Sequence, residues 1–190
     1  MPTQLFKLSE LAEVRSGYTF RGALEHDPSG DIRVLQIKDL RHSTAIEPNK
    51  LTAITWDART AAPLLQPGDI TVIARGDSNR AALYKNEQAV VATSQFFIVS
   101  VKKLNVFPEY LCWMINLPQS QRSLERSGSS IQAISKGALQ EMIIPLPPRA
   151  TQQKLIELQR LWDEEDQLIA RLQNNREHMM QGIYQHLIKG

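Results

Sequence analysis

One uninterrupted helical segment constrains the fold of this chain more than any other feature of its sequence. From Thr151 to Ile188 there is no proline and only one glycine, whereas the stretch just before it, Ile143-Ile-Pro-Leu-Pro-Pro148, holds three prolines. Prolines close a strand and threonine is a favourable N-cap, so we expect one long helix that begins near Thr151. At about 1.5 Å per residue this helix is roughly 55 Å long.

Apolar residues recur along this helix at a heptad-like spacing. With Leu158 at position a, the a positions are Leu158, Glu165, Leu172, Met179 and His186, and the d positions are Leu161, Leu168, Asn175 and Gly182. A rod of this length cannot pack fully against one domain of about 150 residues, whose radius of gyration is only about 15 Å. We therefore expect a partner helix, with an amphipathic helix folded back on its own domain as the alternative. The expected dimer-interface residues are Leu158, Leu161, Trp162, Leu168, Leu172 and Asn175.

The residues before the helix have the pattern of a domain that mixes sheet and helix. Short apolar runs rich in Val and Ile alternate with turn signals. The strand candidates are Ile32–Ile37, Ile70–Ala74, Ala81–Tyr84, Ala89–Ala92, Phe96–Val101 and Met142–Ile144. The helix candidates are Ser9–Val14, Glu109–Leu117, Gln119–Arg126 and Ser135–Met142. We predict an α/β fold: a globular domain over residues 1–148, with a twisted mixed β-sheet and flanking helices, and then a coiled-coil-forming helix over residues 149–190.

Composition excludes several classes of protein. With 190 residues, 42% of them hydrophobic and 22% charged, the chain can bury a core, and its single cysteine, Cys112, excludes a disulfide scaffold. Four histidines without paired spacing predict no metal site. The N-terminus lacks an apolar signal segment and no apolar run is long enough to span a membrane, so we expect a cytoplasmic protein. Residues 1–150 hold 17 Lys and Arg against 14 Asp and Glu, which places the small basic surplus in the globular part.

No catalytic motif is recognisable. The chain has neither a G-x-G-x-x-G nor a G-x-x-x-x-G-K-[ST] phosphate loop, and its Pro-Pro pair, in Leu146-Pro-Pro-Arg149, lacks the amide and aromatic residues of a base-modifying loop. None of the nine lysines follows an acidic residue by two positions, as nuclease centres commonly require. We expect a protein that is not an enzyme and needs no cofactor.

Four stretches follow one another in an order typical of one family. Phe6–Val14 precedes Ser16-Gly-Tyr-Thr-Phe20, and Ile32–Leu40 ends in an Asp-Leu step. Leu65-Gln-Pro-Gly-Asp69 leads into the Arg75-Gly76 turn, and Ile131–Pro148 is followed by Gln152-Gln-Lys-Leu-Ile156. Together these stretches resemble the specificity subunit of type I restriction-modification enzymes, over almost the whole chain. Members of that family typically carry two recognition domains and two conserved helices, so this chain resembles a half-subunit or a piece of a longer one.

The resemblance implies a non-catalytic module that reads double-stranded DNA and recruits type I methyltransferase subunits and, through them, the restriction subunit. Arginine and asparagine suit guanine and adenine edges, and lysine and serine suit phosphates. Such residues stand in polar turns, for which solvated loops are the alternative interpretation. The candidate DNA-binding residues are Lys38, Arg41, His42, Arg75, Asn79, Arg80, Lys85, Ser129, Ser130 and Lys136.

The long helix adds an expectation about assembly. Two copies that pair their helices around a two-fold axis would form a homodimer and read a palindromic bipartite target. The competing hypothesis is a coiled-coil adaptor or inhibitor that binds protein partners without sequence-specific DNA contact.

Overall fold

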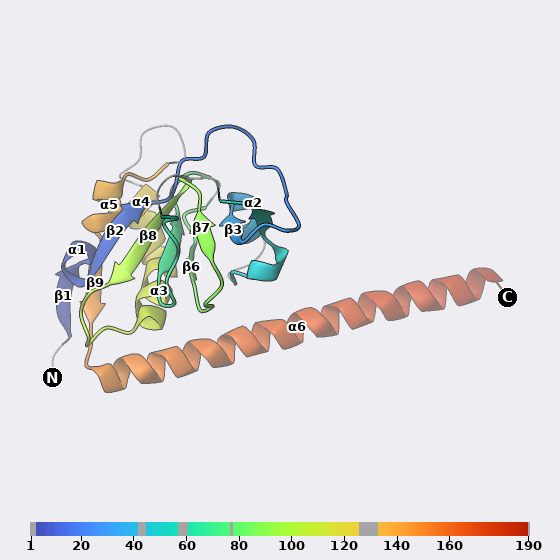
Figure 1. Cartoon of the computed structure of the whole chain (residues 1–190). Coiled ribbons are helices and arrows are strands. Elements are labelled where there is room, and N and C mark those ends of the chain that lie inside the picture. Colours follow the sequence, from blue (N-terminus) through green and yellow to red (C-terminus); the bar gives the residue numbers. More distant parts are fainter. Residues whose placement is uncertain (1–2, 42–44, 57–60, 77, 126–132, 190) are drawn as a thin grey trace. The chain divides into compact units, whose positions relative to one another are not determined.

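A computed structural model describes residues 3–41, 45–56, 61–76, 78–125 and 133–189 of the chain (Figure 1). Contacts between Cα atoms divide the chain into two compact units, residues 1–152 and 153–190. The first unit combines short strands with short helices, and the second is helical. The expected α/β fold class with a long C-terminal helix is confirmed.

The largest sheet has four antiparallel strands in the order β2-β8-β5-β6. These strands are β2 (Ala12–Ser16), β5 (Ile70–Ile73), β6 (Ala81–Leu83) and β8 (Phe96–Val101). Every residue of β5 is buried, as its apolar run predicts for a central strand. The strand Phe96–Val101 has the bounds that its sequence predicts.

Two smaller sheets complete the first unit. A three-stranded mixed sheet has the order β4-β3-β7, in which β3 (Ile32–Leu35) runs antiparallel to β4 (Thr52–Ile54) and parallel to β7 (Val90–Ala92). In the other sheet, β1 (Gln4–Lys7) pairs antiparallel with β9 (Ile143–Leu146) and so joins the two ends of the unit. The main buried cluster holds side chains of both larger sheets, among them Leu35 of β3 and Phe96 of β8.

Short helices cover the first unit, and one long helix forms the second. The short ones are α1 (Leu8–Leu11), α2 (Ile37–Leu40), the 3-10 helix η1 (Pro48–Lys50), α3 (Pro108–Asn116), α4 (Pro118–Glu125) and α5 (Lys136–Gln140). The long helix α6 runs over Arg149–Lys189. Among the residues that the structure describes, no helix combines the length and apolarity that crossing a membrane requires.

The helix expected over Ser9–Val14 is wrong in its second half. The helix α1 ends at Leu11, and Ala12–Ser16 is strand β2, paired with β8 from Ala12↔Val101 to Ser16↔Phe97. Buried Ala12 and Val14 alternate with the exposed Glu13, which is the two-residue period of a half-buried strand. The pairing with β8 outweighs the helical tendency of the local sequence.

Two further expectations about element ends need correction. The strand that starts at Ile32 stops at Leu35, because Asp39 Oδ2 accepts a hydrogen bond from Gln36 N at 2.8 Å and starts α2. Thr151 is not the N-cap of the long helix: it lies inside the first turn, where its N–H donates to Pro148 O at 2.8 Å. The strands β1 and β4 were not expected from the sequence.

Candidate nucleic-acid interface

Backbone hydrogen bonds bring the ends of several strands together at one edge of the first unit. Thr93 N donates to Leu35 O at 3.1 Å, so the end of β7 lies beside the end of β3. Ala74 N, just after β5, donates to Gln95 O at 2.8 Å, and Ala74 O accepts from Ile134 N at 2.9 Å. Polar segments that follow β3, β5 and Ile134 therefore emerge side by side.

Five of the candidate DNA-binding cations stand on these segments, and we call them the basic edge. They are Lys38, Arg41, Arg75, Arg80 and Lys136. Arg80 is half-buried and the other four are exposed. A Cβ atom built on Gly76 would lie 3.9 Å from Ile37 Cδ1, which places α2 against the β5–β6 turn. Within the described residues none of the five forms an ion pair, so their charges are available to an anionic partner.

The β5–β6 turn is held in place by amide side chains of the turn itself and of two helices. Asn79 Nδ2 donates to Ile73 O at 3.0 Å across the turn, and Gln121 Nε2 of α4 donates to Asn79 O at 3.1 Å. Asn116 of α3 makes two hydrogen bonds to the backbone of Ala81, at 2.8 and 2.9 Å. The Asn79 amide N–H is thus engaged within the turn, which fits a positioning role better than adenine readout.

Sequence reasoning did not identify Asn116 or Gln121, the residues that hold this turn from outside. Both stand on helices, and no local pattern marks a helical amide that bonds to a turn more than thirty residues away.

Burial raises the pKa of Asp39, next to Lys38, although the Gln36 backbone N–H and the Lys38 charge lower it.

An aromatic cluster follows the end of β2. The Tyr18 ring lies 4.9 Å from the Phe20 ring and 5.0 Å from the Trp56 ring, measured between centroids. Tyr18 N donates to Ala92 O and Tyr18 O accepts from Ser94 N, so the cluster joins the turn between β7 and β8. All three aromatic residues are half-buried and pack on one another.

The structure does not bring every candidate to the basic edge. Lys85 follows β6, whose residue Leu83 pairs with Ile70 at the start of β5, so it lies at the opposite end of the hairpin from Arg75. His42, Ser129 and Ser130 lie outside the described residues.

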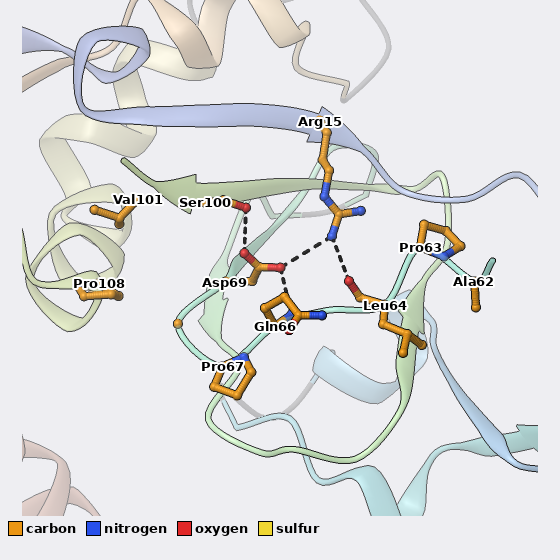
Figure 2. Close-up of a pocket in the computed structure, with 11 residues that line it drawn as sticks. Arg15, Ala62, Pro63, Leu64, Gln66, Pro67, Asp69, Ser100, Val101 and Pro108 are labelled. Atoms are coloured by element: carbon orange, nitrogen blue, oxygen red, sulfur yellow. Dashed lines mark hydrogen bonds and ion pairs between the residues drawn. The ribbon is translucent and has the colours of Figure 1, made fainter. Parts of the chain in front are cut away.

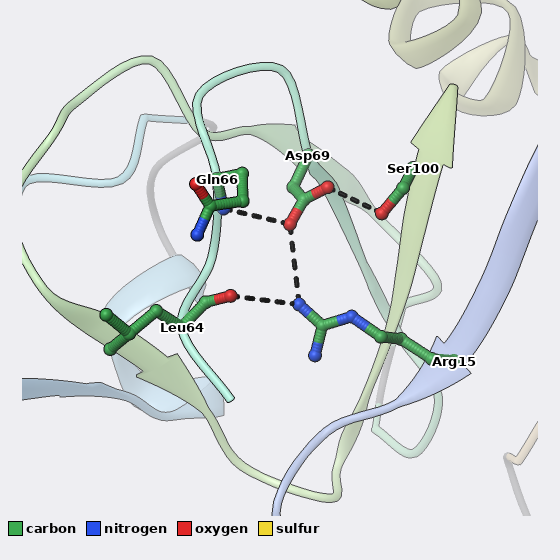
Figure 3. A network of polar contacts seen from close by, with 5 residues as sticks. All are labelled: Arg15, Leu64, Gln66, Asp69 and Ser100. Carbon is green, nitrogen blue, oxygen red and sulfur yellow. Dashed lines mark hydrogen bonds and ion pairs between the residues drawn. The ribbon is translucent and has the colours of Figure 1, made fainter. Parts of the chain in front are cut away.

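A second polar constellation holds the Leu65–Asp69 motif to the four-stranded sheet (Figures 2 and 3). Asp69 is buried, and its carboxylate accepts hydrogen bonds from Gln66 N at 3.0 Å and Ser100 Oγ at 2.6 Å. Arg15 of β2 pairs with it at 3.4 Å and also donates to Leu64 O. These groups border a cavity of about 750 Å³. Because both carboxylate oxygens of Asp69 accept hydrogen bonds that join three separate segments of the chain, we assign the network a structural role.

The expected dimer-interface residues lie on α6. Leu158, Leu161 and Leu172 are 39%, 61% and 65% exposed, and Trp162 is 46% exposed. Leu168 and Asn175 are exposed as well. Apolar side chains exposed at this density along a helix are typical of an unoccupied interface.

The described residues offer no site for a metal ion. Within the described ranges, no three or more His, Cys, Asp and Glu side chains gather as metal ligands would. Cys112 is buried on α3, and burial raises the pKa of its thiol to about 12, so it is not a reactive nucleophile.

Comparison with protein families gives one match. The model of the "Type I restriction modification DNA specificity domain" matches residues 2–175. No curated protein matches the chain.

Solved structures of similar fold are found at low sequence identity. One, described as "Structural basis underlying complex assembly and conformational transition of the type I R-M system", matches with a TM-score of 0.74 and 16% identity over 96% of this chain. The HsdS subunit from Thermoanaerobacter tengcongensis matches with a TM-score of 0.63 and 16% identity over 91%. The type I restriction-modification S subunit from M. genitalium matches with 0.56 and 14% over 85%.

The present chain spans only part of each of these proteins. It covers 43% of the first chain and 39% of each of the other two.

Proposed function

The chain belongs to the family of type I restriction modification DNA specificity domains, and on that premise we propose that it reads one half of a bipartite DNA target. Its role in the complex is recognition, and the chemistry is performed by the methyltransferase subunits that it recruits. The observation that carries this proposal is the basic edge, where cations on three separate segments lie together and form no ion pair within the described residues.

The make-up of the basic edge supports contact with duplex DNA. Arginine binds guanine or phosphate through two parallel hydrogen bonds, and Arg75 and Arg80 flank a turn held by Asn79 and Gln121. Lysine acts as a point charge toward phosphate, and Lys38 and Lys136 stand on the neighbouring segments. A turn fixed from both sides presents its guanidinium groups with little loss of conformational entropy on binding.

The exposed apolar side chains of α6 support the further proposal that two copies act together. The two solved S subunits are more than twice as long as this chain, and a homodimer would supply a second recognition unit and a second helix. The exposed apolar residues of α6 are then the dimer interface, and the paired helices hold the two recognition units apart. The methyltransferase subunits bind this dimer.

Salt dependence of DNA binding tests the recognition role. We expect the logarithm of the affinity for a 30-base-pair duplex to fall linearly with the logarithm of the salt concentration. The expected slope is about −2 to −4, because each phosphate contact contributes about −0.9. Fluorescence anisotropy between roughly 50 and 200 mM salt measures it. A flat line would favour a coiled-coil adaptor that does not bind DNA.

A further inference from the structure

Two charged residues interrupt the apolar stripe of α6. Glu165 has Leu161, Trp162, Leu168 and Ile169 at the positions three and four residues away, all of them apolar. Residues at these spacings are its neighbours on the helix surface. The carboxylate therefore stands in the middle of the apolar stripe rather than on its border.

Arg176 occupies a similar place about three turns later. Its neighbours at the same spacings are Leu172, Met179 and Met180, with Gln173 as the single polar one. Neither Glu165 nor Arg176 forms an ion pair within the part of the chain that the structure describes. Any partner that covers the stripe must therefore meet one anion and one cation, eleven residues apart.

The apolar stripe has a heptad repeat that accommodates both charges. One column of this repeat is Leu158, Glu165, Leu172 and Met179, and the other is Trp162, Ile169, Arg176 and Ile183. The spacing alternates between four and three residues throughout, as a coiled-coil seam requires. In this seam Leu161, Leu168 and Asn175 lie on the flank, whereas the heptad assigned from the sequence places all three at position d.

The charges discriminate between the two possible directions of a second copy. In a parallel, in-register pair Glu165 faces Glu165 and Arg176 faces Arg176, so both charged layers are repulsive. In an antiparallel pair the two columns face each other, and one register places each Glu165 opposite an Arg176. A buried like-charge layer costs far more than a matched one, since each charge loses water without gaining a partner.

We propose that α6 pairs with α6 of a second copy in an antiparallel register in which Glu165 of each chain meets Arg176 of the other. The two-fold axis then passes between Ala170 and Arg171. The proposal rests on the homodimer of the proposed function, whose helices must be antiparallel to hold the two units apart, and adds the register and the ion pair that sets it.

The same register matches the remaining layers without further adjustment. In its apolar layers a residue of one chain faces a residue of the other: Leu158 faces Ile183, Trp162 faces Met179, and Ile169 faces Leu172. Each layer occurs twice because of the two-fold symmetry. A methionine sulfur against an indole ring is a favourable contact. Shifting the register by one heptad in either direction would place both Glu165 and Arg176 opposite apolar residues.

Cysteine cross-linking tests direction and register together. We expect the double variant Leu158→Cys/Ile183→Cys to form a disulfide-linked dimer under mild oxidation, and neither single variant to do so. Within one chain the two positions are 25 residues apart, about 37 Å along the helix, so a bond between them joins two chains. The wild-type protein is the control, because its Cys112 is buried.

Charge reversal tests the ion pair. We expect Glu165→Arg and Arg176→Glu each to raise the dimer dissociation constant by about tenfold or more, because each creates two repulsive layers. Mixing the two variants should restore a tight dimer, since one chain then carries two arginines and the other two glutamates. The doubly reversed chain should also dimerise. Analytical ultracentrifugation measures the constants, and circular dichroism checks that each variant is folded.

These experiments distinguish failure of the proposed register from failure of the proposed homodimer. Cross-linking of Leu158→Cys alone, or a dimer unaffected by both reversals, would overturn the antiparallel register and leave the homodimer standing. A wild-type monomer at tens of micromolar would overturn the homodimer and this register with it. DNA recognition by the basic edge is measured separately through the salt slope.

Discussion

At the scale of single residues, the arginines of this chain have two different roles. Arg15 is paired with Asp69 and donates to Leu64 O, so its guanidinium holds two segments of the chain together. Arg75 and Arg80 have no acidic partner among the described residues and stand at a turn that other side chains hold. Only the second arrangement leaves the charge free for a ligand.

We therefore expect Arg80→Ala to weaken binding to the cognate DNA by about 1–3 kcal/mol if it contacts a base. If it contacts a phosphate, the loss should be the same for all sequences and the salt slope should fall by about one unit. Anisotropy titrations on cognate and scrambled duplexes distinguish the two cases. Lys85→Ala is the matched control, because Lys85 lies at the other end of the hairpin. Equal losses in both variants would remove the basic edge as the DNA-binding surface.

At the scale of elements, the start of α6 shows how one side chain joins a helix to a domain. Gln152 is fully buried, and its Oε1 accepts from Phe107 N at 3.1 Å. Its Nε2 donates to Asn105 O and to Pro147 O, both at 2.9 Å. The amide thus bonds to the chain segment before α3 and to the end of β9 at once, and the first helical turn is part of the first unit.

Gln152→Ala should lower the free energy of unfolding of the first unit by about 2–4 kcal/mol, because it leaves buried backbone groups without partners. Urea denaturation followed by tryptophan fluorescence measures this change. Gln153→Ala is the matched control. Gln153 is exposed, its side chain bonds to Glu157 alone among the described residues, and the substitution should change stability by less than about 0.5 kcal/mol. Similar values for the two variants would contradict the anchoring role of Gln152.

At the scale of the whole molecule, the proposed homodimer has a consequence for the DNA target. Two identical chains related by a two-fold axis read identical half-sites in inverted orientation. Paired helices that hold helix starts roughly 35–55 Å apart correspond to half-sites separated by about 10–16 base pairs at about 3.4 Å per step. The antiparallel register with its axis between Ala170 and Arg171 places the two helix starts at Arg149 about 64 Å apart, which corresponds to about 19 base pairs and lies above this range.

Co-expression with type I methyltransferase subunits should therefore give methylation of a palindromic motif with two specified halves and an unspecified spacer. Sequencing that detects methylated bases reads this motif directly from the host DNA. An asymmetric motif would show that two different recognition units act together, and would exclude the homodimer as the active form.

The sequence by itself determined the long helix and the family of the chain. A proline-free segment with a heptad stripe has few alternatives to a helix, and the three prolines before it place its start within two residues. Strand Phe96–Val101 was equally predictable, because continuous β-branched and aromatic residues between turn signals form a buried strand in most contexts.

Only the tertiary structure decided which polar turns lie together and which ends of the chain pair. The sequence made Arg75, Lys85 and Lys136 all candidates. The hydrogen bond from Ile134 N to Ala74 O brings Arg75 and Lys136 together, whereas the β5–β6 hairpin places Lys85 at its other end. The change from α1 to β2 depends on β8, more than eighty residues along the chain. Such outcomes depend on pairing between distant segments, and the energy of a pairing belongs to both strands, so neither segment predicts it alone.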